Sequence, residues 1–357
     1  MCNNEIKPNS ITFDLTDRCQ LKCKTCLKWK TKASDVIDKE LTTEEWKKVI
    51  FEIREWLGEY CCIYFSGGEP FLREDIFELI EYASSLNINV GSMTNAYSIE
   101  HLYDKIANSK LKYLSLSLNA ITDENIHDTS RGRENSYKKC IDAIKNLNEL
   151  IKDKEDKLKI NLATILFKEN INEAIKLVEF VKENNLDGIS FQLIDDLDVF
   201  HAFYTQKFID TKNYKMKNEL IEEYKNISKN GIKIIDKLIE MKNNNYPIYN
   251  SVEQLKGIQT LLKDYKKIVK QIKCNVGNTN IAIDPYGDIR LCFNMQPVGN
   301  IKDGSLKEIW NNKKANICRE NIKTCKMPCR LLNCNFKEDK QEKKSLIKFV
   351  KSFFKGN

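Results

Sequence analysis

Six short runs rich in β-branched and aromatic residues alternate with helix-period segments through the first two hundred residues of this chain. The predicted strands are 10–15, 61–66, 89–93, 113–118, 160–165 and 189–194, and helical segments 42–57, 74–85, 99–108, 136–152 and 172–184 follow the first five. Such alternation builds parallel β/α units, and the continuously apolar strands are typical of a sheet covered on both faces. We therefore predict an α/β fold, a partial (β/α)6 TIM-like barrel, with its functional site at the carboxyl ends of the strands.

Composition divides the chain into four parts. Residues 1–213 form the predicted barrel, and the lysine-rich helical segment 214–273 forms a bridge. Residues 274–340 hold six of the 13 cysteines and are predicted to form a small cysteine-rich α+β domain with a β-hairpin around the turn at 285–288. The tail, 341–357, is basic and amphipathic, which is typical of weak membrane-surface contact. A terminal helix packed on the domain is the preferred interpretation.

The net charge of +7 comes from lysines scattered over predicted helix faces, which indicates solvated surface and no nucleic-acid partner. No apolar run is long enough for a signal peptide or a membrane span, so a cytoplasmic location is expected. Thiols stay reduced there. The cysteines are therefore expected to bind metal or to do redox chemistry rather than to form disulfides.

Three cysteines follow the first predicted strand in a C-x3-C-x2-C run: Cys19, Cys23 and Cys26. A closed zinc site needs four ligands, and a cubane iron–sulfur cluster normally takes four cysteines. Three thiolates would leave one iron open to chelate another molecule. The alternatives are a structural zinc knuckle and simple buried cysteines.

A second motif, Ser66-Gly67-Gly68-Glu69-Pro70, follows the second strand at the same edge of the sheet. Two glycines allow the backbone to approach a ligand closely. Glu69 offers a carboxylate for a cationic amine, and such charge-assisted hydrogen bonds are strong.

Together these motifs resemble the radical S-adenosylmethionine (SAM) superfamily. In that family the open iron binds the amino and carboxylate groups of SAM, and an electron from the cluster cleaves SAM into methionine and a 5′-deoxyadenosyl radical. The radical takes a hydrogen atom from the substrate. The resemblance implies a [4Fe-4S] cluster on the three cysteines, with Gly67, Gly68, Glu69 and Pro70 contacting the SAM amino group. Thr25 departs from the family, which often has an aromatic residue there.

Further strand ends resemble the family more loosely. The resemblance implies SAM contacts for residues after or within strands three to six: Asn95, Ser117, Asn119, Arg131 and Gln192. Asn119 stands where the family commonly has Asp, and Arg131 would meet the SAM carboxylate. For each alone, an ordinary loop or capping role is at least as well supported.

The C-terminal cysteines resemble the SPASM/twitch domain, which carries one or two auxiliary four-iron clusters. The full version has seven cysteines, and the six here, in a different spacing, favour one auxiliary cluster. Its predicted ligands are Cys274 and Cys292 with two of three later cysteines: Cys325, Cys329 and Cys334. Cys318 is the weakest candidate, with simple packing as its alternative, and a zinc ribbon is the alternative for the region.

The predicted activity is therefore hydrogen abstraction by a radical SAM oxidoreductase or maturase, supplied with electrons by a reductant such as flavodoxin or ferredoxin. The substrate is a sugar-like small molecule or a peptide or protein side chain. The expected absence of a recognition domain before residue 10 mildly disfavours a peptide. The carboxylates at Asp195, Asp196 and Asp198 supply a proton acceptor or form a solvated loop. The alternative is a non-enzymatic iron–sulfur or zinc protein that transfers electrons or binds a partner.

Overall fold

A single nine-stranded sheet runs through the computed structural model, which describes residues 6–26, 28–30, 39–58, 62–196 and 210–331. Six parallel strands form most of it, in the order β6-β5-β4-β3-β2-β1. They are β1 (Ser10–Thr16), β2 (Cys62–Gly67), β3 (Asn89–Thr94), β4 (Tyr113–Ser117), β5 (Lys159–Leu166) and β6 (Gly188–Leu193). The sheet is not closed, and its parallel part confirms the predicted partial barrel.

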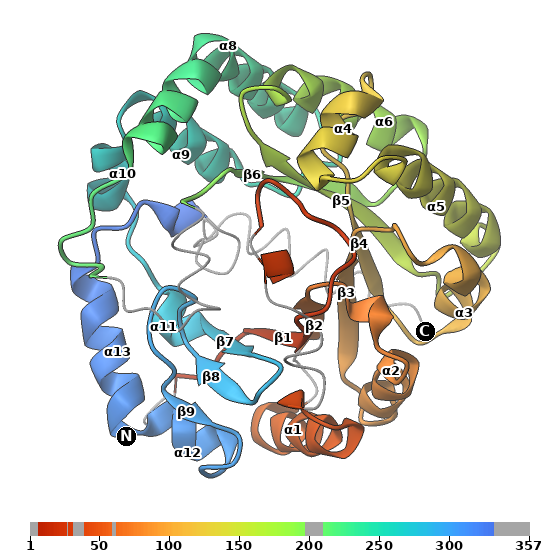
Figure 1. Ribbon diagram of the computed structural model, residues 1–357, viewed down its shortest axis with the longest axis vertical. Helices are drawn as coiled ribbons and strands as arrows, with labels where there is room; N and C mark the ends of the chain where they lie inside the picture. The colour runs from red at the N-terminus through yellow and green to blue at the C-terminus, as the bar shows by residue number, and fades with distance from the viewer. Residues whose placement is uncertain (1–5, 27, 31–38, 59–61, 197–209, 332–357) are drawn as a thin grey trace.

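Helices lie around the outside of the sheet (Figure 1). The helices predicted to follow the first five strands are observed as α1 (Thr43–Leu57), α2 (Ile76–Ser85), α3 (Tyr103–Asn108), α5 (Ser136–Ile151) and α6 (Ala174–Glu183). Short 3-10 turns are η1 (Lys28–Lys30), η5 (Pro70–Leu72), η6 (Glu100–Leu102), η7 (Ile171–Glu173) and η8 (Cys329–Leu331). The polar helix α4 (Glu124–Arg131) was not predicted, because its eight residues carry only one aliphatic side chain.

Alternation along the strands separates a helix-facing core from the inner face of the sheet. In β5 every second side chain is buried, and the others are only partly covered. On β1, Phe13 stacks on Trp46 of α1 and on Phe65 of β2, with ring centroids 4.7 and 5.9 Å apart. Each fully buried aromatic side chain of this kind contributes about 1.5–3 kcal/mol. The core therefore fixes the strand ends that carry the site.

The later part of the chain is helical and then mixed. Helices α8 (Asn218–Asn243), α9 (Val252–Lys263) and α10 (Tyr265–Gln271) lie beyond β6 (Figure 1). The cysteine-rich region holds α11 (Val276–Thr279), β7 (Asn280–Ile283), β8 (Asp288–Arg290), β9 (Gly299–Asn300), α12 (Leu306–Asn311) and α13 (Lys313–Thr324). β7 and β8 pair antiparallel, which confirms the predicted hairpin. The division of the chain into four parts stays a prediction.

The hairpin joins the barrel sheet, a pairing that was not predicted. β7 runs parallel to β1, with Ser10 opposite Asn280 and Phe13 opposite Ile283. On the outside, Trp310 of α12 packs edge-on against Trp56 of α1, with ring centroids 6.0 Å apart. The barrel and the cysteine-rich region therefore share one hydrogen-bonded sheet.

No helix within the described residues is long and apolar enough to cross a membrane. The predicted tail, 341–357, lies outside those residues. So do the candidate ligand Cys334 and the candidate proton acceptor Asp198.

Candidate active site

The loop that carries Cys19, Cys23 and Cys26 leaves the carboxyl end of β1 and packs directly on the loop after β2. The amide of Gly68 donates to the Thr16 carbonyl at 2.7 Å, and the amide of Glu69 donates to the Arg18 carbonyl at 2.8 Å. A Cβ at residue 68 would lie 2.1 Å from the Arg18 oxygen. The close backbone approach expected of this motif is therefore, in this structure, an approach to the cysteine loop.

Helix α4 holds the same loop from another side. The Lys24 amide donates to the Ser130 carbonyl at 2.9 Å. Gly132, which ends α4 with φ +65°, lies so close that a Cβ would be 2.2 Å from the Lys22 oxygen. Two strand-end segments thus fix the path of the cysteine loop.

A buried ion-pair cluster closes the base of the loop. The Lys28 ammonium lies 3.1 Å from a carboxylate oxygen of Asp14 and 2.9 Å from one of Asp17. Burial raises the pKa of Asp14 in spite of the neighbouring lysine. Buried charges of this kind must be paired. Sequence reasoning missed this cluster, although Asp14, a charged residue between Phe13 and Leu15 in a predicted strand, was a signal for it.

The thiols of the loop have polar partners. The side-chain Nδ2 of Asn95 lies 3.7 Å from Cys19 Sγ, and Nη1 of Arg131 lies 3.8 Å from Cys23 Sγ. Burial raises the pKa of Cys19 to about 12 and also raises that of Cys26. Thiolates at these positions therefore depend on a bound metal, which deprotonates its thiol ligands.

Within the described residues, no group of three or more His, Cys, Asp or Glu side chains converges closely enough for a single metal ion. An iron–sulfur cluster binds each thiolate to a different iron, so its ligands do not converge on one point.

Glu69 is completely buried beside this loop. Its carboxylate accepts hydrogen bonds from the Thr94 hydroxyl at 2.9 Å, the backbone N–H of Asn95 at 2.8 Å and the backbone N–H of Phe71 at 3.3 Å. Burial raises the pKa of Glu69 to about 7. A carboxylate has about four lone-pair sites, so one remains for a further donor. A cationic amine there would stabilise the ionised form.

Arg131 brings a cation to the same site. Its side chain is buried, and its Nε has no hydrogen-bond partner among the described residues. Buried donors are normally satisfied. With Nη1 beside the Cys23 sulfur and Nε without a partner among the described residues, the guanidinium fits a bound anionic group, such as a carboxylate.

The structure separates the remaining predicted contacts. Asn119 is buried and engaged with the protein, because its side chain bonds the Ser130 hydroxyl at 2.9 Å and the Ile165 amide at 3.3 Å. Ser117 is half-buried at the end of β4. Gln192, on β6, lines a different pocket. The cysteine loop, Glu69, Asn95 and Arg131 are the ones brought together.

Five cysteines of the described C-terminal region lie near one another, and we call them the SPASM-region thiols. They are Cys274, Cys292, Cys318, Cys325 and Cys329. Burial raises the pKa of Cys292, and the neighbouring thiols of Cys274, Cys318 and Cys325 raise it further. Burial also raises the pKa of Cys329, with Cys292 among its neighbours. Cys318, the weakest ligand candidate from sequence, is buried in α13 with its sulfur 3.6 Å from the Met295 sulfur. It is also close enough to raise the pKa of Cys292, so it belongs to the group.

Two of these sulfurs accept hydrogen bonds. The Met327 amide lies 3.4 Å from Cys325 Sγ, and the Asn294 side-chain amide lies 3.5 Å from Cys329 Sγ. Hydrogen bonds to sulfur are one means by which proteins tune iron–sulfur clusters. These donors therefore fit thiolate ligands.

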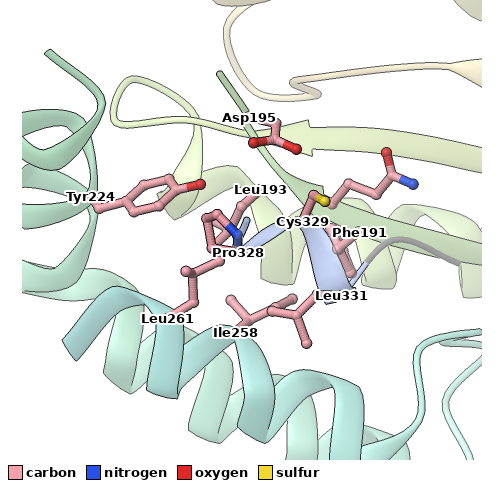
Figure 2. A pocket seen from close by; sticks show the side chains of 10 residues that line it. Phe191, Leu193, Asp195, Tyr224, Ile258, Leu261, Pro328, Cys329 and Leu331 are labelled. Carbon is pink, nitrogen blue, oxygen red and sulfur yellow. The ribbon is translucent and has the colours of Figure 1, made fainter. Parts of the chain in front are cut away.

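A small pocket lies between the end of β6 and one of these five thiols, Cys329 (Figure 2). Asp195, Tyr224 and Cys329 lie around it, with apolar side chains of α9 below them. Burial raises the pKa of Asp195 to about 6. Asp196 is instead bonded to the Tyr214 hydroxyl at 2.8 Å, so the two carboxylates differ in environment.

Comparison with known families agrees with this geometry. Residues 13–181 match the radical SAM superfamily, and residues 274–335 match SPASM, an iron–sulfur cluster-binding domain. The chain is a radical SAM enzyme with a C-terminal SPASM domain. Its cofactors are accordingly SAM and a [4Fe-4S] cluster, with auxiliary iron–sulfur binding in the SPASM domain. Members of the family are enzymes, which favours hydrogen abstraction over the electron-carrier alternative.

Curated relatives have low sequence identity to this chain but match it over most of its length. The PqqA peptide cyclase of Bradyrhizobium diazoefficiens is 24% identical over 93% of this chain and 80% of its own. The AdoMet-dependent heme synthase of Methanosarcina barkeri is 26% identical over 85% of this chain and 82% of its own.

Solved structures share the fold. Streptococcus suis SuiB bound to S-adenosylmethionine superposes with a TM-score of 0.63 at 18% identity, over 91% of this chain and 74% of that one. The enzyme anSMEcpe with AdoMet and the Kp18Cys peptide gives 0.62 at 17%, over 96% and 97%.

Proposed function

We propose that this enzyme abstracts a hydrogen atom from a peptide substrate, using a SAM molecule held between the cysteine loop and Glu69. The observation that carries the proposal is the direct packing of the Gly68-Glu69 backbone on the loop that holds Cys19. This packing makes the distance between the thiols and the buried carboxylate a fixed property of the fold.

The residues of the SAM site take complementary roles in this proposal. Cys19, Cys23 and Cys26 hold the cluster, which supplies the electron for SAM cleavage when it is bound. Glu69 receives the SAM amine, since a buried carboxylate gains most from a cationic partner. Arg131 receives the carboxylate, because its buried Nε lacks a partner among the described residues.

We assign other roles to the remaining six predicted contacts. Gly67 and Pro70 shape the turn that presents Glu69, and Asn95 links that carboxylate to the Cys19 sulfur. Asn119 acts by positioning α4. Ser117 and Gln192 lie at the carboxyl ends of β4 and β6, where the substrate is expected to bind.

The auxiliary cluster is assigned to the SPASM cysteines. Cys274, Cys292, Cys325 and Cys329 are the proposed ligands within the described residues, and Cys334 remains a candidate outside them. Cys318 stays a further candidate because of its closeness to Cys292. The auxiliary cluster would accept an electron from the substrate radical or bind the substrate.

The relatives favour a peptide over a sugar-like substrate. They include a peptide cyclase and the antilisterial bacteriocin subtilosin biosynthesis protein AlbA, and SuiB has been solved with its precursor peptide SuiA. A flavodoxin or ferredoxin is the proposed reductant.

Incubation of the reconstituted, reduced protein with SAM tests the proposal. We expect 5′-deoxyadenosine to form, and we expect Cys26→Ala to abolish it. Cys140→Ala is the matched control, because Cys140 is a buried core thiol in α5. Absence of 5′-deoxyadenosine from wild-type protein with intact clusters would instead support an electron carrier.

A further inference from the structure

The SPASM hairpin touches the base of the cysteine loop. Because β7 runs parallel to β1, the turn after β7 lies at the same end of the sheet as that loop. The Tyr286 hydroxyl donates to Asp17 Oδ2 at 2.9 Å. The neighbouring Pro285 carbonyl accepts a hydrogen bond from the Leu41 amide at 2.7 Å. One turn of the SPASM domain thus makes two direct contacts with the radical SAM domain.

Asp17 is one end of the buried clasp that closes the loop. It lies two residues before Cys19, and Lys28 lies two residues after Cys26. The Lys28–Asp17 ion pair, at 2.9 Å, therefore joins the two ends of the segment that holds all three cysteines. With Asp14 also bonded to Lys28, the clasp has two carboxylates and one ammonium. The Tyr286 hydroxyl stabilises the excess negative charge at the outer oxygen of Asp17.

Tyr286 is itself held by its own hairpin. Its amide donates to Asp284 Oδ1 at 3.0 Å, and its carbonyl accepts from the Asn300 side chain at 3.1 Å. Along the chain the hairpin lies between Cys274 and Cys292, two proposed auxiliary ligands. A cluster bound to both would brace the hairpin at its two ends.

We propose that Tyr286 is a positioning residue through which the SPASM domain sets the conformation of the SAM-binding cysteine loop. The proposal rests on the ligand assignments made above. It assigns the effect to a single path, from the hydroxyl of Tyr286 to the carboxylate of Asp17 and from there to Lys28. The auxiliary domain thereby acts on SAM binding as well as on the substrate.

The variant Tyr286→Phe removes only the hydroxyl. In the fully reconstituted protein we expect unchanged auxiliary iron content and about tenfold weaker SAM binding, the scale of one hydrogen bond to a charged group. The electron paramagnetic resonance signal of the reduced SAM cluster should also respond less to added SAM. Tyr137→Phe is the matched control, because it loses a tyrosine hydrogen bond, to the Ile121 carbonyl at 3.0 Å, away from the clasp.

A double-mutant cycle with Asp17→Asn separates this path from general stabilisation. If Tyr286 acts through Asp17, the Tyr286→Phe effect on SAM binding disappears in the Asp17→Asn background. Additive effects would overturn the proposal, as would a Tyr286→Phe protein with wild-type SAM affinity and spectrum. Loss of auxiliary iron in Tyr286→Phe would also overturn it, by showing a general structural role. These readouts need no turnover, so they stay informative even if no 5′-deoxyadenosine is formed.

Discussion

The contact between Gly68 and Arg18 makes a demanding prediction about a single methyl group. In Gly68→Ala the new Cβ would meet the Arg18 carbonyl oxygen at 2.1 Å and its carbon at 2.6 Å. Both atoms belong to backbone, so no side chain can rotate away. Ordinary van der Waals contact begins near 3.4 Å. The cysteine loop and the Gly67–Glu69 turn must therefore separate by at least about 1.3 Å.

That displacement acts directly on the proposed SAM site. It breaks or lengthens the hydrogen bonds from Gly68 to Thr16 and from Glu69 to Arg18, which are now 2.7 and 2.8 Å. Overpacking of this kind costs about 1–3 kcal/mol of stability. A shift of about 1 Å at a reacting site commonly lowers the rate about 100-fold. We therefore expect a folded protein with 5′-deoxyadenosine formation reduced by about 100-fold.

The assay compares iron content, thermal stability and 5′-deoxyadenosine formation in Gly68→Ala and in Gly58→Ala. Gly58 has φ +76°, and no described atom lies within 4 Å of the point that a Cβ would occupy, so its substitution adds backbone strain without a clash. The control should lose stability but keep SAM cleavage. Wild-type SAM cleavage by Gly68→Ala would refute the claim that this contact fixes the geometry of the site.

Three further predictions concern buried charge. Glu69→Gln should retain its iron but bind SAM about 10- to 100-fold more weakly, measured by calorimetry. In the wild-type protein the SAM affinity should rise as the pH passes 7, where the Glu69 carboxyl ionises, and the variant should lose this rise. Burial raises the pKa of Asp284 to about 7, so the folded protein holds a proton that the unfolded chain releases above about 4. The stability of the metal-free protein should therefore fall from pH 5 to 8, and Asp284→Asn should flatten that slope in chemical denaturation. Lys28→Met should cost about 3–5 kcal/mol by leaving Asp14 and Asp17 unpaired, and adding Asp14→Asn should recover part of the loss; equal stability of the two variants would contradict the ion-pair argument.

The sequence predicted the strands well because local periodicity determines them. All six parallel strands were located to within two residues at either end, and the hairpin was identified from its turn residues. Helix α4 escaped detection because its role is to present polar residues, His127 and Arg131 among them, rather than to bury an apolar face. The pairing of β7 with β1 joins residues about 270 positions apart. No local pattern specifies such a register.

The site likewise has features that local sequence patterns predict and features that depend on long-range contacts. Local motifs identified the three cysteines and Glu69 as neighbours, since consecutive strand ends meet at one edge of a parallel sheet. The partners that hold the loop come from distant segments, and the sequence pattern around them does not show that they contact it. Tyr286 and Ser130 are ordinary residues whose importance depends on contacts that only the fold creates.

The addition of β7 to β1 has a consequence for engineering. Removing the SPASM region would strip the hydrogen-bonding partner from one side of the first barrel strand and leave an open edge, which is a template for aggregation. Chimaeras that exchange this region between relatives must therefore keep the β7 register and the Pro285-Tyr286 turn together. The two metal-binding regions share one hydrogen-bonded sheet, so neither can be exchanged as an independent module.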